Sequence, residues 1–245
     1  MAGHNKWSKI KRQKAVKDQR RSNYFTKLGR AIAVAVKEGG GVTDPQMNYK
    51  LRLAIEKARQ ANMPNANIKR AIEQGAGKSG SGQIMTALYE GFGPAHVATL
   101  VEVVTDNKQR AYQEIRQIFD KSGGSLSQPG AVSFLFKRVG LVLIKGVQPD
   151  DEETALEIME IAGVEDLDWD GEVLQLVVEP KQLKAVQDAL ISQGREVAEA
   201  RLEMMPLQPV KLSPEEEEKV LKFIAKLEDS DEVQQVYTNV DWSEE

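Results

Sequence analysis

Apolar side chains recur every three or four positions through the first third of the chain, as they do along one face of an α-helix. This spacing predicts three helices over residues 23–38, 45–61 and 65–74, with Ser22 capping the first. Three short helices that each carry one apolar stripe form a small bundle. The residues predicted to face its core are Phe25, Leu28, Ile32, Val36, Met47, Leu51, Ala54, Ile55, Ala58, Ile68, Ala71 and Ile72.

The pattern changes after a glycine- and serine-rich stretch at residues 75–83, which we interpret as a linker. Runs rich in β-branched and aromatic residues then predict strands at 84–90 and 96–105. A helical period follows at 107–121, and an apolar run predicts a further strand at 131–137.

Residues 140–205 have the pattern of a self-contained unit. Its predicted elements are, in order, a strand at 140–145, a helix at 150–162, strands at 164–169 and 172–179, a helix at 181–193 and a strand at 196–204. The order βαββαβ is that of the ferredoxin-like arrangement.

The end of the chain predicts a short strand at 207–212, a helix that begins with the cap Ser213, and a strand at 233–239. These elements either complete the sheet that begins near residue 84, which makes 140–205 an insertion, or they form a third domain in series. Both arrangements are α+β, and the pattern leaves them open.

The charge of the chain is divided unevenly between its two parts. Residues 1–82 carry 18 Lys and Arg against 5 Asp and Glu, a net of +13, whereas residues 83–245 carry 15 against 32, a net of -17. The two values sum to the formal charge of -4. This asymmetry indicates a basic binding module joined to an acidic body, which repels phosphate wherever the module is not engaged.

The basic bias is strongest from Gly3 to Leu28, where nine Lys and Arg stand beside the single acid Asp18. Phosphate backbones attract such a segment, and an aromatic within it can stack on a base; a solvated N-terminus is the alternative interpretation. The predicted nucleic-acid-binding residues of this stretch are Lys6, Trp7, Lys9, Lys11, Arg12, Lys14, Lys17, Arg20, Arg21 and Lys27. Those of the predicted helices are Arg30, Lys50, Arg52, Lys57 and Arg59.

The residue types for catalysis or cofactor binding are sparse. The chain has no cysteine, which excludes disulfides, cysteine-ligated zinc and a thiol nucleophile. Its two histidines, His4 and His96, have no partner at ligand spacing, so neither a metal nor a cofactor is predicted. The sequence around Lys78 lacks a phosphate-loop glycine, because Ile72 stands in its place. No apolar run approaches the ~18 residues that span a membrane.

Two weaker hypotheses remain open at this point. Asp166, Asp168 and Asp170 alternate along a predicted strand and would suit a magnesium-dependent enzyme on nucleic acid, but we find no enzyme signature and predict a non-enzyme. A helix-turn-helix is conceivable between residues 45–61 and 65–74, although a bundle core explains the same spacing. Contacts dominated by phosphate do not specify sequence, so the residues leave duplex DNA and structured RNA undistinguished.

Seven motifs lie along the first 136 residues. They are GHNKWSKIK (3–11), FTKL (25–28), GGGVTDPQMN (39–48), LRLAIEKARQANMPNANIKRAIEQGAG (51–77), YEGFGP (89–94), VEVVTDNKQR (101–110) and FDKSGGSLSQPGAVSFLF (119–136). Together these motifs resemble the YebC family, a group that includes the mitochondrial translational activator of cytochrome oxidase subunit one. The family typically has a glycine pair where Ala95 and His96 stand, and Asn and Thr where Gln109 and Ala111 stand.

The resemblance implies an α+β protein with an N-terminal helical bundle and two α/β domains, the last inserted in the second. The implied domains are 1–82, 83–138 with 206–245, and a ferredoxin-like domain at 139–205. The resemblance also implies a nucleic-acid-binding regulator of gene expression. Proteins similar to this one are described as DNA-binding transcriptional regulators and, alternatively, as ribosome-associated translation factors that help synthesis through proline runs.

The expected partner is therefore duplex DNA or ribosomal RNA, with the ribosome as a further partner and no membrane. Because the resembling motif begins at residue 3, we expect no cleaved presequence and a cytoplasmic protein of the bacterial type. The sequence does not predict a protein partner for the acidic domains.

Overall fold

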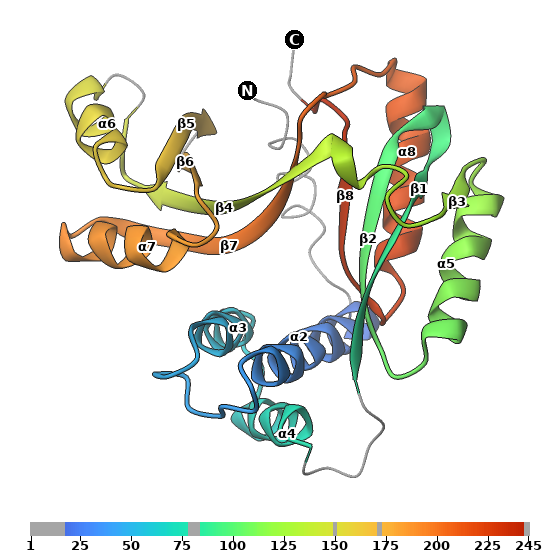
Figure 1. Cartoon of the computed structure of the whole chain (residues 1–245), viewed down its shortest axis with the longest axis horizontal. Coiled ribbons are helices and arrows are strands. Elements are labelled where there is room, and N and C mark those ends of the chain that lie inside the picture. The colour runs from blue at the N-terminus through green and yellow to red at the C-terminus, as the bar shows by residue number, and fades with distance from the viewer. Residues whose placement is uncertain (1–17, 78–83, 149–150, 171–172, 243–245) are drawn as a thin grey trace. The chain divides into compact units, whose positions relative to one another are not determined.

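The computed structural model of the 245-residue chain describes residues 18–77, 84–148, 151–170 and 173–242 (Figure 1). The described part is α+β, with two four-stranded sheets whose strands all pair antiparallel. The chain forms two compact units, and one interrupts the other. The first unit in the chain comprises Lys14–Leu135 and Leu212–Asn239; the inserted unit comprises Phe136–Lys211 with the segment that begins at Val240.

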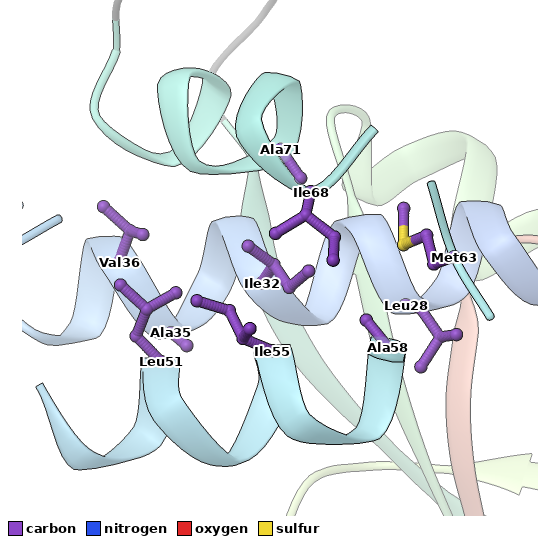
Figure 2. Close-up of a cluster of buried hydrophobic side chains, with 10 residues drawn as sticks. All are labelled: Leu28, Ile32, Ala35, Val36, Leu51, Ile55, Ala58, Met63, Ile68 and Ala71. Carbon is purple, nitrogen blue, oxygen red and sulfur yellow. The ribbon is translucent and has the colours of Figure 1, made fainter. Parts of the chain in front are cut away.

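Three helices share one hydrophobic core at the start of the described chain. Helix α2 is Asp18–Glu38, α3 is Tyr49–Gln60 and α4 is Asn65–Gly75. Figure 2 shows α3 and α4 on opposite sides of α2, with side chains from all three between them. The core residues are Leu28, Ile32, Ala35, Val36, Leu51, Ile55, Ala58, Met63, Ile68 and Ala71.

The sequence placed the start of two of these helices wrongly. Helix α2 already includes Asp18, so Ser22 lies inside it and does not cap it. Helix α3 begins at Tyr49 and not at 45, because Asn48 caps it: the Asn48 side chain accepts from the Leu51 N–H at 3.1 Å and donates to the Ala35 carbonyl at 2.9 Å. Met47 therefore precedes the helix and is 79% exposed, although it was predicted to face the core.

The first sheet has the strand order β3-β1-β2-β8. Its strands are β1 (Met85–Phe92), β2 (Ala98–Thr105), β3 (Ser125–Ser127) and β8 (Val233–Thr238). The last strand pairs with β2, opposite residues such as Val101 and Val236, so it completes the sheet that begins at Met85. Helices α5 (Lys108–Lys121) and α8 (Pro214–Glu228) meet at an edge-to-face contact between Phe119 and Phe223, whose ring centroids are 4.9 Å apart.

The predicted strand at 131–137 is wrong over most of its length. The chain forms a short 3-10 turn, η2, at Ser133–Leu135, and strand β4 begins only at Phe136. The reason is a side chain far away in the sequence. The carboxylate of Glu90, on β1, accepts hydrogen bonds from the backbone N–H groups of Gly130, Val132 and Ser133 at 3.0, 3.1 and 3.0 Å. These N–H groups therefore do not enter a strand ladder. The strand predicted at 207–212 is reduced to one bridge between Val210 and Val240.

The inserted unit holds the second sheet, with strand order β5-β6-β4-β7. Its elements are β4 (Phe136–Lys145), α6 (Glu152–Met159), β5 (Val164–Asp170), β6 (Val173–Val178), α7 (Leu183–Ser192) and β7 (Glu196–Pro206). Along the chain this is the βαββαβ order expected from the sequence. Strands β4 and β6 and helix α7 supply the buried Val142, Leu174, Leu176, Val186 and Leu190.

Candidate nucleic-acid interface

The predicted binding residues fall into two groups. Lys6, Trp7, Lys9, Lys11, Arg12, Lys14 and Lys17 lie outside the described residues, and Arg20 and Arg21 lie in α2 with side chains that are not described. The structure describes the side chains of Lys27, Arg30, Lys50, Arg52, Lys57 and Arg59.

The cations of α2 are hydrogen-bonded to the backbone of the first sheet and its helix. Lys27 donates to the carbonyl of Glu228, and Arg30 donates to the carbonyl of Asp231. Lys37 does the same with the carbonyl of Ile84 at 2.7 Å. Glu228 is the last residue of α8, where unpaired carbonyls form the negative end of the helix dipole and favour a cation. Lys27 and Arg30 thus hold α2 against the body, a role that the sequence did not reveal.

The cations of α3 are held more loosely. Lys50 lies 2.5 Å from a carboxylate oxygen of Glu38, but both side chains are about half exposed, and such pairs are worth only ~0–1 kcal/mol. The guanidinium of Arg52 lies 5.4 Å from the ring centroid of Tyr49, a cation–π distance. Lys57 and Arg59 are exposed in the last turn, where a cation also stabilises the helix end.

Helix α4 adds two cations that were not among the predicted site residues. Lys69 and Arg70 are exposed, and neither makes a hydrogen bond or ion pair with another described residue. Their position opposite the buried Ile68 and Ala71 was visible in the helical period and marks them as surface residues. The exposed cations of the two helices are therefore Lys50, Lys57 and Arg59 on α3 with Lys69 and Arg70 on α4.

These exposed cations belong to two helices, α3 and α4, that lie on opposite sides of α2 (Figure 2). Both helices pack mainly on α2 and not on each other. The shared core therefore accounts for the short connection between them without a helix-turn-helix. Residues 18–77 carry 11 Lys and Arg against 5 Asp and Glu, a net of +6, so positive charge exceeds negative charge in the bundle.

The candidate metal and membrane features gain no support in the described part of the chain. The structure arranges no group of three or more His, Asp or Glu side chains there in a way that suits a metal ion. Asp166 accepts a hydrogen bond at 2.9 Å from the N–H of the next residue, Leu167. His96 is exposed, and His4 lies outside the described residues. Among the described helices, none combines the length and the apolar character needed to cross a bilayer.

Comparison with known proteins decides the family. Residues 5–78 match the TACO1/YebC protein N-terminal domain, and residues 84–240 match the TACO1/YebC second and third domain. The chain belongs to the TACO1/YebC family. This confirms the resemblance carried by the sequence motifs.

TACO1/YebC relatives match this chain over nearly its whole length. A probable transcriptional regulatory protein of Caldanaerobacter subterraneus is 43% identical over 245 residues, which are 100% of both chains. A probable transcriptional regulatory protein of Chloroflexus aurantiacus is 46% identical and covers 98% of this chain and 96% of its own. The crystal structure of a conserved hypothetical protein from Aquifex aeolicus superposes with a TM-score of 0.82 at 37% identity, covering 93% of each chain.

Proposed function

We propose that this protein is a non-enzymatic, nucleic-acid-binding regulator of gene expression that acts on duplex DNA as a transcriptional regulator. Residues 1–17, which we call the arm, and the exposed cations of α3 and α4 form the contact surface. The names of its relatives support the regulatory role, since they are called probable transcriptional regulatory proteins. The segregation of charge supports the nucleic-acid ligand, and it is the observation that carries the proposal.

The exposed cations support phosphate contact for a physical reason. Arg59, Lys69 and Arg70 have no hydrogen-bond or ion-pair partner among the described residues, so their side chains are available to a ligand. A polyanion that binds them releases its own condensed counterions. The arm adds Lys6, Lys9, Lys11, Arg12, Lys14 and Lys17 without a single acid in residues 1–17.

A second candidate is a ribosome-associated translation factor, and one observation favours it. Helices α3 and α4, which carry the exposed cations, lie on opposite sides of α2, whereas a single recognition helix in a major groove would need its cations on one face. Folded RNA can contact a basic body on several sides and is recognised through shape and stacking more than base edges. Trp7 in the arm suits stacking on an unpaired base.

In-cell crosslinking of the full chain, followed by sequencing of all attached DNA and RNA, tests both candidates. Enrichment at a few promoters, with about 1,000-fold or greater preference for those duplexes in vitro, supports the transcriptional regulator. Enrichment on ribosomal RNA, with co-sedimentation at moderate salt under stalling conditions, supports the translation factor instead. A chain that crosslinks to neither polymer overturns nucleic-acid binding altogether.

The domain organisation belongs to the same proposal. We assign the domains as 1–82, 83–138 with 206–245, and 139–205. The pairing of β8 with β2 supports the split domain, and the strand order β5-β6-β4-β7 supports the ferredoxin-like assignment of the insert. In this organisation the basic bundle is the nucleic-acid module, and the two acidic domains remain available for other contacts.

A further inference from the structure

Strand β7 forms one edge of the sheet in the inserted unit, because the strand order is β5-β6-β4-β7 (Figure 1). Its backbone pairs with β4 on one side, and no backbone hydrogen bond joins its other side to a described residue. Nine of its 11 side chains are exposed or half-buried, whereas seven of the ten in β4 are buried. A long edge strand is a ready template for pairing with another chain.

The features that usually protect an edge strand lie only at the ends of β7. A β-bulge bends the strand at its start, where the register against β4 shifts between Val197 and Glu199. The only proline is the last residue, Pro206, and the strand has no lysine. Between these ends, seven residues from Glu199 to Met205 pair with β4 without interruption, and the middle one is Leu202. The open part of the edge is therefore centred on Leu202.

The two sides of this seven-residue stretch differ in chemistry, because side chains alternate along a strand. Leu202 pairs with Gly140, and a Cβ atom at Gly140 would lie 3.0 Å from the Leu183 side chain, so Leu202 is on the side of α7. Arg201 and Glu203 lie on the opposite side, where Arg201 donates to Glu203 at 2.6 Å. The stretch therefore offers apolar side chains on one side and charges of both signs on the other.

We propose that two copies of this chain pair antiparallel through β7 about a two-fold axis at Leu202, which joins their sheets edge to edge. A two-fold axis makes every contact reciprocal. Leu202 then lies opposite the same residue of the second copy, and Ala200 lies opposite Met204 of the second copy. Arg201 of each copy lies opposite Glu203 of the other, and cross-strand pairs of opposite charge stabilise a sheet.

The neighbouring registers are less favourable. A shift of the axis by one residue places Arg201 against Arg201 or Glu203 against Glu203, and directly opposed like charges destabilise a sheet. A shift by two residues toward the start of β7 brings the bulge into the new ladder. A shift by two toward its end brings in Pro206, which has no N–H to donate. The axis at Leu202 avoids all of these, and the pairing stands whether or not the chain binds nucleic acid.

A single cysteine introduced into the full chain reports this register, because the chain has none of its own. Leu202→Cys should form an intermolecular disulfide under mild oxidation, since directly opposed Cα atoms lie about 4.5–5.5 Å apart. Ala200→Cys should not link to itself, because its two copies are four positions, or about 14 Å, apart. A mixture of Ala200→Cys and Met204→Cys chains should link. The matched control Ala185→Cys, exposed on α7, should give about tenfold less disulfide dimer than Leu202→Cys.

Sedimentation of the unmodified chain over a range of concentrations gives a second measurement. An interface of one strand from each copy is small, below about 1,200 Å², so we expect a weak dimer with a Kd on the order of 100 µM. Leu202→Lys places two like charges on the axis and should weaken association by about tenfold, whereas Ala185→Lys should leave it unchanged. The pairing is overturned if the unmodified chain is still a monomer at about 1 mM. It is also overturned if Ala200→Cys links to itself, or if Ala185→Cys links as readily as Leu202→Cys.

Discussion

The helical bundle and the inserted unit use charged side chains in opposite ways. Residues 18–77 carry 11 Lys and Arg against 5 Asp and Glu, a net of +6, while residues 136–211 carry 8 against 16, a net of -8. In the bundle, three exposed cations, Arg59, Lys69 and Arg70, have no partner among the described residues. In the inserted unit, Arg201 is held between Glu199 and Glu203.

The comparison distinguishes charged side chains that stabilise the fold from charged side chains that contribute little to it. Arg201 pairs with the buried carboxylate of Glu203, so removing it would leave that charge without this partner. The cations on α3 and α4 contribute little to the fold, because their helices are held by the apolar core that faces α2. Positive charge that the fold does not need suits a ligand of opposite sign, as proposed above.

The largest expected effect comes from removing the charge of the arm. Replacing Lys9, Lys11, Arg12 and Lys14 together with Ala should weaken binding to duplex DNA or RNA by on the order of 100-fold at physiological salt. The slope of log K against log salt should fall in magnitude by about 3 to 4, because four phosphate contacts are lost. Binding isotherms at four or more salt concentrations measure both quantities.

A matched variant in the inserted unit shows whether location or total charge matters. Replacing Lys137, Lys145, Lys181 and Lys184 with Ala removes the same number of cations. Three of them form exposed ion pairs, with Glu165, Glu196 and Asp188, so little stability is lost. Affinity and salt slope should stay within about twofold of the unmodified chain. Equal losses in the two quadruple variants would mean that net charge, and not the basic module, sets the affinity.

The next effect concerns a carboxylate that the fold does need. Burial alone would raise the pKa of Glu90, but the N–H groups of Gly130, Val132 and Ser133 outweigh it and hold the pKa below its ordinary value. Replacing Glu90 with Gln puts an amide donor against those N–H groups and should lower the free energy of unfolding by about 2 kcal/mol at pH 7. Denaturant titration measures the loss, with Glu56→Gln on the exposed face of α3 as the control.

The effect of Glu90→Gln should depend on pH in a defined direction. Because the folded pKa is lowered, the carboxylate stabilises the fold fully above the unfolded value of about 4.3. This stability is lost as the pH falls through the folded pKa. The difference between Glu90→Gln and the unmodified chain should therefore be constant from pH 7 to about pH 5 and shrink below about pH 4. If the difference in unfolding free energy grew on acidification, Glu90 would not stabilise the fold as an ionised carboxylate.

A smaller effect separates two sets of cations inside the bundle. Replacing Lys27 and Arg30 with Ala removes hydrogen bonds to the carbonyls of Glu228 and Asp231 and should destabilise the chain by about 1–2 kcal/mol. The folded protein should still bind nucleic acid within about twofold, since these cations contribute few phosphate contacts.

The converse variant replaces Arg59, Lys69 and Arg70 with Ala. It should change stability by no more than about 0.5 kcal/mol, because these side chains are exposed and unpaired among the described residues. Its salt slope should fall by about 2 to 3. Thermal melts and salt-dependent isotherms on both variants check the pair of predictions. If both variants lose binding and stability together, the division into used and unused charge is wrong.

The sequence predicted elements best where local signals mark their ends. Helix α4 is Asn65–Gly75 against the predicted 65–74, because Pro64 precedes its first turn and glycine closes its last. The strand predicted at 131–137 failed because its backbone N–H groups bond to Glu90, 40 or more residues earlier in the chain. A hydrophobic period of two or 3.6 residues reports only local structure, so it cannot predict a hydrogen bond to a side chain so far away in the sequence.

The same limit applies to the candidate site. Counting charges along the chain was enough to locate the basic module. It could not show that Lys27 and Arg30 serve the fold, because their acceptors are backbone carbonyls 201 residues away. Lys69 and Arg70 could have been chosen from the helical period alone, since they lie opposite Ile68 and Ala71. The helical period therefore predicts which cations lie on the surface, but it cannot predict which of them are hydrogen-bonded to distant parts of the chain.

The smallest expected effect concerns the turn between β1 and β2. This turn lies outside the basic bundle and contains the exposed His96. Ala95 and His96 both have φ of +56°, a left-handed conformation that disfavours any residue with a Cβ. The TACO1/YebC resemblance places a glycine pair at these two positions, which suits that backbone. Ala95→Gly and His96→Gly should each stabilise the chain by about 0.5–1 kcal/mol, the strain relieved being larger than the entropy cost of glycine.

If side chains in the acidic domains serve only the fold, His96→Gly should leave nucleic-acid affinity and its salt slope unchanged. Substituting His96 with Ala separates the two causes, because it removes the imidazole and keeps the strained Cβ. His96→Ala should therefore match the unmodified chain in stability, while only the glycine variants gain. A loss of affinity in both His96 variants would place this turn on the nucleic-acid surface, so the basic module would no longer be the sole contact.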